Sequence, residues 1–173
     1  AMLLTGPNMG GKSTLLRQIC LAVLMAQCGA DVPAKSLKLT AVDRVFVRMG
    51  AQDSILAGQS TFLVELSETA SMLHLATRNS LVALDELGRG TATMDGLAIA
   101  HAVLRHLTGK LSCRALFSTH YHSLANDIWP HNSLSLRHMG CELQTSSKGE
   151  EDVVFLYILR HGACPKSYGI NVA

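Results

Sequence analysis

The sequence lacks a strong charge of either sign and a long apolar run, and each absence excludes a class of protein. Its 173 residues carry 15 basic and 13 acidic side chains, a net charge of +2, whereas a domain that grips nucleic acid over a broad face is strongly basic. The longest apolar run, Ile19 to Ala26, is far shorter than the ~20 residues that cross a bilayer. No leader with a charged start and a small-residue cleavage site opens the sequence. We therefore expect a soluble intracellular domain with no membrane contact.

A cysteine framework is also missing. The five cysteines are odd in number and no two have C-x-x-C spacing, so neither a disulfide scaffold nor a zinc ribbon is indicated. We expect them to be buried free thiols in a reducing compartment. Hydrophobic residues at 48% and charged residues at 16% indicate a core-rich globular protein. With no repeat and no linker, we expect one domain over residues 1–173, a fragment of a longer chain.

Short apolar runs alternate with amphipathic segments, which is typical of an α/β protein. Strands buried on both faces are expected at 1–5, 81–84 and 115–117. Helices are expected after residue 11, from about residue 60, and over 97–107. For the second helix we expect one side to carry Phe62, Leu63, Leu66, Ala70 and Leu73. A half-exposed strand at 43–48 and a strand pair at 134–143 and 153–159, joined by an exposed loop over 144–152, complete the prediction.

The strongest motif fits G-x-x-x-x-G-K-[ST] at every fixed position; its residues are Gly6, Pro7, Asn8, Met9, Gly10, Gly11, Lys12 and Ser13. Glycines let backbone N–H groups turn inward around phosphate oxygens, and the following helix adds its positive N-terminal end. Lys12 can reach the β- and γ-phosphates, and the Ser13 hydroxyl can bind Mg²⁺. The alternative is a glycine-rich turn with a coincidental lysine, which the preceding strand and following helix disfavour.

Two acids follow the apolar run at 81–84. Asp85 at the end of a strand is the Walker B arrangement for holding Mg²⁺, and Glu86 directly after it suggests a general base for an attacking water. The alternative is a pair of surface acids that cap the strand. The P-loop upstream favours the first interpretation.

Three further features allow two interpretations each. His120 ends another apolar run, so it is expected at the same edge of the sheet as Asp85, where it could sense the γ-phosphate; a structural histidine or a metal pair with His122 are the alternatives. Ser60 is either a helix N-cap or part of a phosphate-binding helix end that faces another subunit's nucleotide. Arg89 is a catalytic or interface arginine or a solvated loop charge.

Four segments together resemble the MutS family of DNA mismatch-repair ATPases, in the family's order: TGPNMGGKST at 5–14, GQSTF at 58–62, LDELGRGTAT at 84–93 and FSTHYH at 117–122. The resemblance spans essentially the whole chain. Segments 66–70, 117–122 and 162–169 are most similar to the eukaryotic MutS homologue 6 type, and 57–60 and 78–82 resemble its plant or green algal forms.

The resemblance implies an ABC-superfamily P-loop NTPase domain, with a mostly parallel sheet and peripheral antiparallel strands. It implies ATP and Mg²⁺ as cofactors and a composite site in which each nucleotide lies between two subunits, here in a heterodimer with a MutS-homologue 2 type subunit. Nucleotide state would gate a clamp on mismatched double-stranded DNA in the nucleus. The clamp domains, an upstream adenine-stacking aromatic and a downstream helix-turn-helix are expected outside this chain.

The resemblance also assigns roles to residues. The phosphate-binding segment runs from Gly6 to Thr14, with Asn8 near the γ-phosphate, Lys12 catalytic, and Ser13 and Asp85 on Mg²⁺. Glu86 would be the base and His120 a switch histidine. Ser60 would contact the partner's nucleotide in trans, and His138 would lie near adenine.

Other functions remain open at this point. A nucleotide-gated interaction module of another ABC-type ATPase, with marginal hydrolysis, is the main alternative. A P-loop phosphotransferase is disfavoured because no acceptor pocket or lid is evident. ABC transporters and chromosome-structural ATPases would show a fuller LSGGQ-like signature than the segment at 56–60.

Overall fold

The computed structural model describes residues 1–50, 60–128, 133–145 and 151–164, and its elements follow the predicted alternation. The strands are β1 (Met2–Thr5), β2 (Val45–Arg48), β3 (Leu81–Asp85), β4 (Arg114–Ser118), β5 (Ser135–Thr145) and β6 (Glu151–His161). The helices are α1 (Lys12–Gln27), α2 (Thr61–Leu75), α3 (Thr93–Arg105), the π-helical turn η2 (His106–Leu111) and α4 (His122–Ile128).

The strands form one sheet in the order β2-β3-β4-β1-β5-β6. All neighbours are parallel except β5 and β6, which are antiparallel. The predicted α/β class with peripheral antiparallel strands is therefore confirmed. In register, Ser118 lies beside both Leu4 and Asp85. The loops that follow β1, β3 and β4 consequently leave the sheet at the same edge, where open α/β folds bind ligands.

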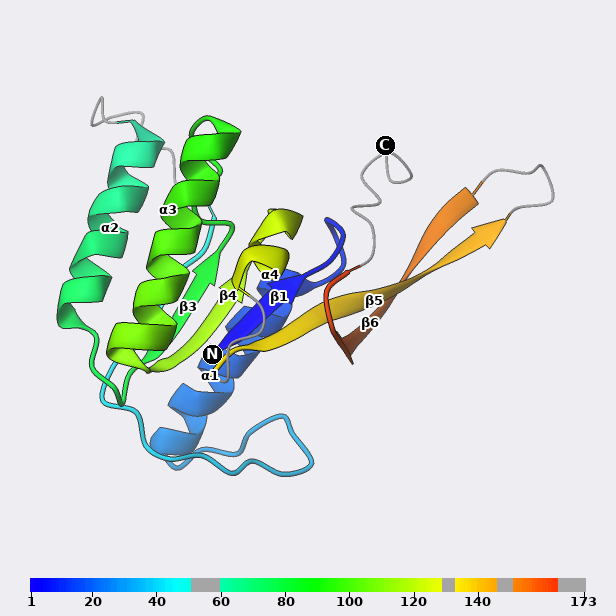
Figure 1. Cartoon of the computed structure of the whole chain (residues 1–173). Helices are drawn as coiled ribbons and strands as arrows, with labels where there is room; N and C mark the ends of the chain where they lie inside the picture. The colour runs from blue at the N-terminus through cyan, green and yellow to red at the C-terminus, as the bar shows by residue number, and fades with distance from the viewer. Residues whose placement is uncertain (51–59, 129–132, 146–150, 165–173) are drawn as a thin grey trace.

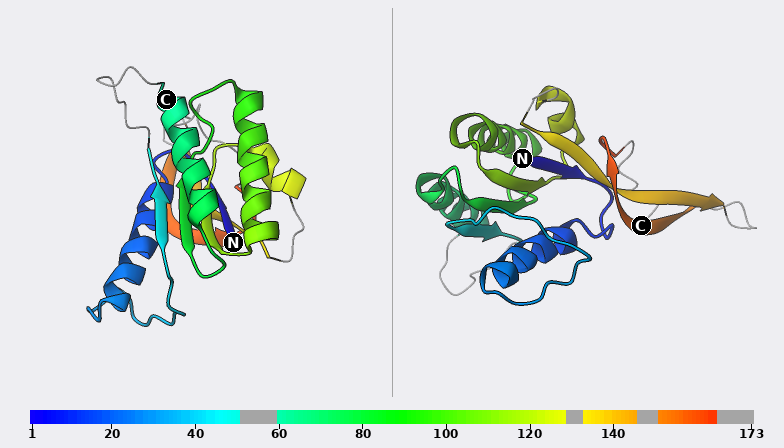
Figure 2. Two further views of the ribbon diagram at one scale, coloured as in Figure 1. Left: turned by 90° about the vertical axis from the view of Figure 1, so that its left-hand side faces the viewer. Right: turned by 90° about the horizontal axis from the view of Figure 1, so that it is seen from below.

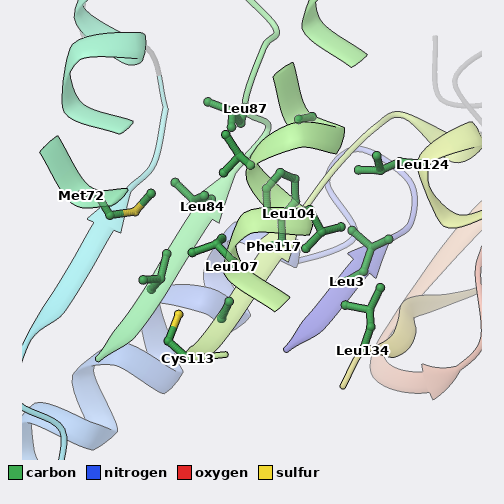
Figure 3. Packing of buried hydrophobic residues seen from close by; sticks show 14 of the residues in the cluster. Leu3, Met72, Leu84, Leu87, Leu104, Leu107, Cys113, Phe117, Leu124 and Leu134 are labelled. Atoms are coloured by element: carbon green, nitrogen blue, oxygen red, sulfur yellow. The ribbon is translucent and has the colours of Figure 1, made fainter. Parts of the chain in front are cut away.

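Helices cover both faces of the sheet (Figures 1 and 2). Helices α2, α3 and α4 lie on one face and α1 on the other. Successive residues of the central strands alternate between the two cores: Leu3 and Val82 belong to the larger cluster (Figure 3), and Leu4 and Ala83 to the cluster under α1. This alternation explains why these strands have continuous apolar sequences.

The buried side of α2 differs from the predicted one. Leu63 and Ala70 are exposed, whereas Glu65, Thr69 and Met72 are buried. Periodicity takes account only of apolar side chains, and two of the buried residues, Glu65 and Thr69, are polar. The Gly88 N–H donates to Glu65 Oε1 at 3.2 Å, and Thr69 Oγ1 donates to the Glu65 carbonyl at 2.7 Å.

The cysteines are free, as predicted, but not all are buried. Cys20, Cys113 and Cys164 are buried, whereas Cys28 is exposed just beyond the end of α1 and Cys141 is half-buried on β5. A search of the described residues finds no helix with the length and hydropathy that a bilayer crossing requires.

The β5–β6 hairpin extends away from the helical layers (Figure 1) and contains an irregularity near its base. The pairing register shifts between Met139 and Cys141, opposite the segment that includes Tyr157. Tyr157 takes a left-handed φ of 53° and its side chain is largely exposed. A bulge of this kind redirects a side chain out of the ladder.

Candidate functional site

The P-loop leads from β1 into α1 through a tight backbone turn. Gly10 N–H donates to the Pro7 carbonyl at 3.2 Å, and Gly11 at the N-cap of α1 has a left-handed φ of 90°, a conformation that glycine adopts without strain. Gly6 also has a positive φ, 135°. The turn therefore presents backbone groups and the N-terminal end of α1 at the edge of the sheet.

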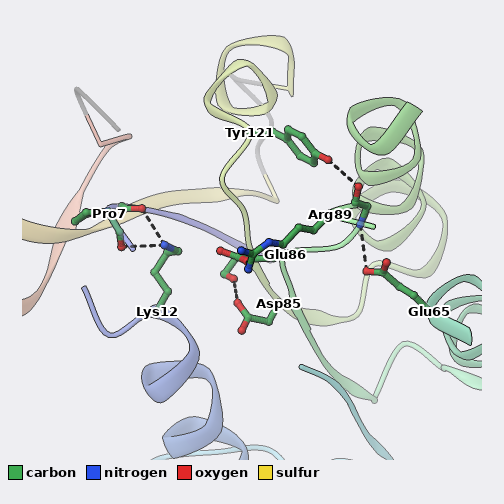
Figure 4. Close-up of polar contacts among 10 residues, drawn as sticks. Pro7, Lys12, Glu65, Asp85, Glu86, Arg89 and Tyr121 are labelled. Carbon is green, nitrogen blue, oxygen red and sulfur yellow. Dashed lines mark hydrogen bonds and ion pairs between the residues drawn. The ribbon is translucent and has the colours of Figure 1, made fainter. Parts of the chain in front are cut away.

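Lys12 is the buried cation of this loop. Its Nζ donates to the carbonyls of Gly6 at 2.9 Å and Pro7 at 3.0 Å, and the residue is only 5% exposed. Burial lowers the pKa of Lys12, while the nearby Glu86 and Asp85 carboxylates oppose that shift. The ammonium is thus held between the loop and two acids (Figure 4).

Asp85 and Glu86 are fixed by their neighbour on β4. The Ser118 hydroxyl donates to the Asp85 carboxylate, and the Glu86 N–H donates to the Ser118 carbonyl at 3.1 Å. Glu86 itself has a left-handed φ of 53°, which is costly for a residue with a Cβ. The role of Ser118 in anchoring both acids depends on the β3–β4 register, and in the sequence it appears only within the FSTHYH segment at 117–122.

Glu86 opens a short turn that also includes Gly88 and Arg89. Arg89 Nη1 lies 2.8 Å from Glu86 Oε2, and the arginine is largely exposed. The carboxylate of the predicted base is therefore paired with an arginine of its own turn (Figure 4). Arg89 is thus neither isolated in solvent nor remote from the site.

A cavity of about 610 Å³ lies between the P-loop and this turn. The P-loop contributes Asn8, Met9 and Ser13 to its lining, and the turn contributes Glu86 and Arg89, with Asp85 beside them. A smaller hollow of about 180 Å³ is lined by Glu86 and by residues of the P-loop segment, which include Pro7, Gly11, Lys12, Ser13 and Thr14. The structure therefore brings the predicted phosphate-binding and acidic residues together.

His120 follows β4 and packs on Tyr121, with ring centroids 4.0 Å apart and planes tilted by 41°. Burial lowers the pKa of His120 below its ordinary value near 6.5, and the Glu86 carboxylate partly offsets this. The shift favours the neutral imidazole. Within the described residues no group of three or more His, Cys, Asp or Glu side chains could hold a metal ion, so the pairing of His120 with His122 as a metal site gains no support.

Two other predicted residues are not among those that line this cavity, although Thr61, next to Ser60, does line it. Ser60 is exposed at the N-cap of α2, and its side chain makes no capping hydrogen bond. His138 lies within β5, and its Nδ1 is 3.0 Å from the Gly162 carbonyl. The first two residues of the GQSTF segment, Gly58 and Gln59, lie outside the described residues, as do residues 51–57 before them.

Sequence analysis did not single out Tyr157. A Cβ on Gly11 would lie 3.2 Å from Tyr157 Cδ1, so the ring lies directly over the P-loop glycine at the N-cap of α1. Its signal in the sequence is weak, because nothing in a run of strand residues marks the bulge that turns Tyr157 toward the loop.

Comparisons with known proteins identify the family of this chain. Residues 2–173 match the family MutS domain V, which is the ATPase domain of P-loop NTPase type. The chain is 64% identical over 172 residues to DNA mismatch repair protein MSH6 of Arabidopsis thaliana, covering 99% of this chain and 13% of that protein. It is 57% identical over 174 residues to human DNA mismatch repair protein Msh6, again covering 99% and 13%.

A second type of relative is more distant: msh3 of Aspergillus oryzae is 51% identical over 173 residues, covering 100% of this chain and 16% of that protein. The chain therefore spans less than a fifth of the length of these relatives. The family match extends over nearly all of its residues, and the two MSH6 relatives exceed the msh3 relative in identity. The chain belongs to the MutS family of mismatch repair proteins and is of the MSH6 type.

Proposed function

We propose that this chain binds and hydrolyses ATP as the nucleotide-dependent part of a mismatch recognition protein, and that its nucleotide state gates a clamp on DNA. The observation that carries the proposal is the cavity that joins the P-loop to the Glu86 turn. A phosphate-binding loop alone would support nucleotide binding. A carboxylate facing that loop supports hydrolysis as well.

The residues fit ATP and Mg²⁺. Lys12 is a buried ammonium whose two partners are backbone carbonyls, so it can turn to phosphate oxygens without breaking an ion pair. The backbone from Gly6 to Thr14 would bind the phosphates, and Asn8 would lie near the γ-phosphate. The hard oxygen donors of Ser13 and Asp85 are those that Mg²⁺ prefers. When bound, Mg²⁺ neutralises charge on the phosphate oxygens.

Hydrolysis then requires a proton acceptor for water. In this proposal Glu86 takes a proton from the water whose oxygen attacks the γ-phosphorus, and the bond to the β-phosphate oxygen breaks, leaving ADP and phosphate. Its carboxylate must first part from Arg89, 2.8 Å away. The neutral imidazole of His120 can donate one N–H toward the γ-phosphate, and this hydrogen bond is lost when the phosphate leaves.

Besides the aromatic expected upstream of this chain, Tyr157 would offer the adenine base a second aromatic face. The ring is exposed, lies opposite the register shift of the hairpin and lies over Gly11; such aromatic faces bind bases whatever their hydrogen-bonding pattern. The assignment of His138 to the adenine stays a prediction, with its Nδ1 engaged by the Gly162 carbonyl.

Partner contacts follow from Ser60. Its hydroxyl is exposed and makes no capping bond at the start of α2, so it is available to a phosphate on another subunit. We infer a heterodimer with a MutS-homologue 2 type subunit in the nucleus, and mismatched double-stranded DNA held by domains outside this chain. The net charge of +2 agrees with DNA binding elsewhere.

The Glu86–Arg89 ion pair favours one alternative: a nucleotide-gated interaction module that hydrolyses ATP marginally. The two functions differ in what a partner does to turnover. ATP turnover by the full-length protein should be measured over a concentration series of the MutS-homologue 2 type subunit. We expect turnover to rise steeply with partner concentration. Low turnover that does not change with partner concentration, with ATP binding intact, would favour the interaction module.

A further inference from the structure

Glu65 is a buried carboxylate that the proposed chemistry does not use. It lies in the second turn of α2 and is only 8% exposed, although acids are rarely buried without a partner. Among the residues that the structure describes, Glu65 forms no ion pair. Its Oε1 instead accepts a hydrogen bond from the Gly88 N–H at 3.2 Å, two residues beyond Glu86.

Tyr121 holds the same peptide from another direction. Its hydroxyl donates to the Gly88 carbonyl at 2.9 Å, and its own N–H donates to Thr119 Oγ1 at 3.0 Å. Glu65 reaches this peptide from α2, and Tyr121 reaches it from the segment after β4; both contacts are dashed in Figure 4. Burial and the nearby Glu65 raise the pKa of Tyr121, which keeps the phenol protonated as a donor.

The turn that they hold is tightly enclosed. Gly88 has a left-handed φ of 88°, and a Cβ there would lie 2.6 Å from the Gly96 carbonyl. A Cβ on Gly90 would lie 3.4 Å from the Cβ of Phe62, in the first turn of α2. The residues after Glu86 therefore lie against α2 at Glu65 and Phe62, and against α3 at Gly96.

This enclosure bears directly on Glu86, whose left-handed φ of 53° persists only if the surroundings determine it. We propose that Glu65 and Tyr121 are positioning residues that clamp the Gly88 peptide and so hold the Glu86 carboxylate toward the cavity. The role rests on the proposed function, in which Glu86 is the base. Because Ser60 lies at the N-cap position of the helix that carries Glu65, a partner that contacts Ser60 would act on the helix that supplies the acceptor for the Gly88 N–H.

The kinetic test uses the full-length protein assembled with its MutS-homologue 2 type partner. Glu65→Leu removes the acceptor, and Tyr121→Phe removes only the donor hydroxyl. We expect each to lower kcat for ATP roughly 10- to 100-fold with KM unchanged, since a small misplacement of a reacting group has effects of this size. Glu65→Gln keeps an acceptor oxygen and should restore most of the rate. Ser71→Leu, on the exposed side of the same helix, is the control.

Amide hydrogen exchange at Gly88 supplies a readout that does not need hydrolysis. We expect faster exchange in Glu65→Leu and parental exchange in Glu65→Gln and Ser71→Leu. The clamp is overturned if Glu65→Gln is as impaired as Glu65→Leu, if KM rises in step with the loss of kcat, or if Gly88 exchange is unchanged in Glu65→Leu. A parent complex with no ATP turnover would instead contradict the proposed function, and the exchange results would still decide for or against the clamp.

Discussion

The P-loop with α1 and the turn 86–90 with α2 face each other across one cavity, but they are held in different ways. The P-loop continues from β1, whose Leu3 and Leu4 are fully buried on opposite faces of the sheet, and α1 buries Leu16 and Cys20 beneath it. Hydrophobic packing fixes this half, and its binding groups are mainly backbone. Apart from Lys12, whose Nζ donates to the Gly6 and Pro7 carbonyls, its geometry therefore depends little on polar side chains.

The opposite half depends on polar side chains. Glu86 has a strained φ. The residues after it are held by a hydrogen bond from the Gly88 N–H to Glu65, by one from the Tyr121 hydroxyl to the Gly88 carbonyl, and by the ion pair with Arg89. The comparison suggests a division of labour in which the P-loop sets ATP affinity and the turn sets the rate of hydrolysis. Substitutions in the two halves should then separate the two quantities.

The largest expected effect is that of Glu86→Gln. Removal of the general base should slow ATP hydrolysis by roughly 10²–10⁴-fold, while ATP affinity stays within about twofold, because no phosphate ligand of the P-loop is lost. Single-turnover hydrolysis and equilibrium binding, measured on one preparation of the assembled protein, test this. Parental turnover in the variant would remove Glu86 from its role.

Lys12→Ala should change the affinity for ATP. Loss of a buried ammonium that can bind phosphate oxygens should weaken ATP binding roughly 10- to 100-fold, since hydrogen bonds to charged groups contribute about 1.5–3 kcal/mol. Titration calorimetry with ATP and Mg²⁺ measures this. Lys38→Ala, at an exposed lysine between α1 and β2, is the control. Equal ATP affinities in Lys12→Ala and the parent would contradict the claim that the P-loop sets ATP affinity.

Gly96→Ala tests how closely the turn is enclosed. A Cβ on Gly96 would lie 2.2 Å from both the Gly88 carbonyl and the Tyr121 hydroxyl, so we expect a loss of about 1–3 kcal/mol in unfolding free energy, as for other overpacked sites. The readout is the melting transition of the full-length protein. Gly109→Ala is the control, because a Cβ there meets nothing within 4 Å. Similar melting of both variants would show that the turn tolerates added volume.

Tyr157→Ala should have the smallest effect. Stacking of a base on an exposed ring contributes about 1 kcal/mol at the low end, so ATP should bind about fivefold more weakly, whereas inorganic triphosphate should bind as before. Tyr157→Phe keeps the ring and should bind ATP like the parent. A loss of triphosphate affinity in Tyr157→Ala would mean that the ring supports the P-loop and not the base.

The sequence was informative where chemistry requires fixed residue types at fixed spacing. The P-loop, the acids after β3 and the central strands could be predicted because glycines, a lysine and apolar runs are visible locally. The buried side of α2 could not, since Glu65 is buried by a hydrogen bond from a residue 23 positions away. Tyr157 was equally hidden, because its position depends on a register shift in the β5–β6 hairpin.

The most direct test is a crystal structure of the full-length Glu86→Gln protein with its partner, ATP and Mg²⁺. The account predicts that Lys12 leaves the Gly6 and Pro7 carbonyls for the phosphates, that Ser13 and Asp85 hold the metal, and that the γ-phosphate faces the Gln that replaces Glu86. ATP bound with its γ-phosphate turned away from that turn, or with Lys12 still on the two carbonyls, would contradict it.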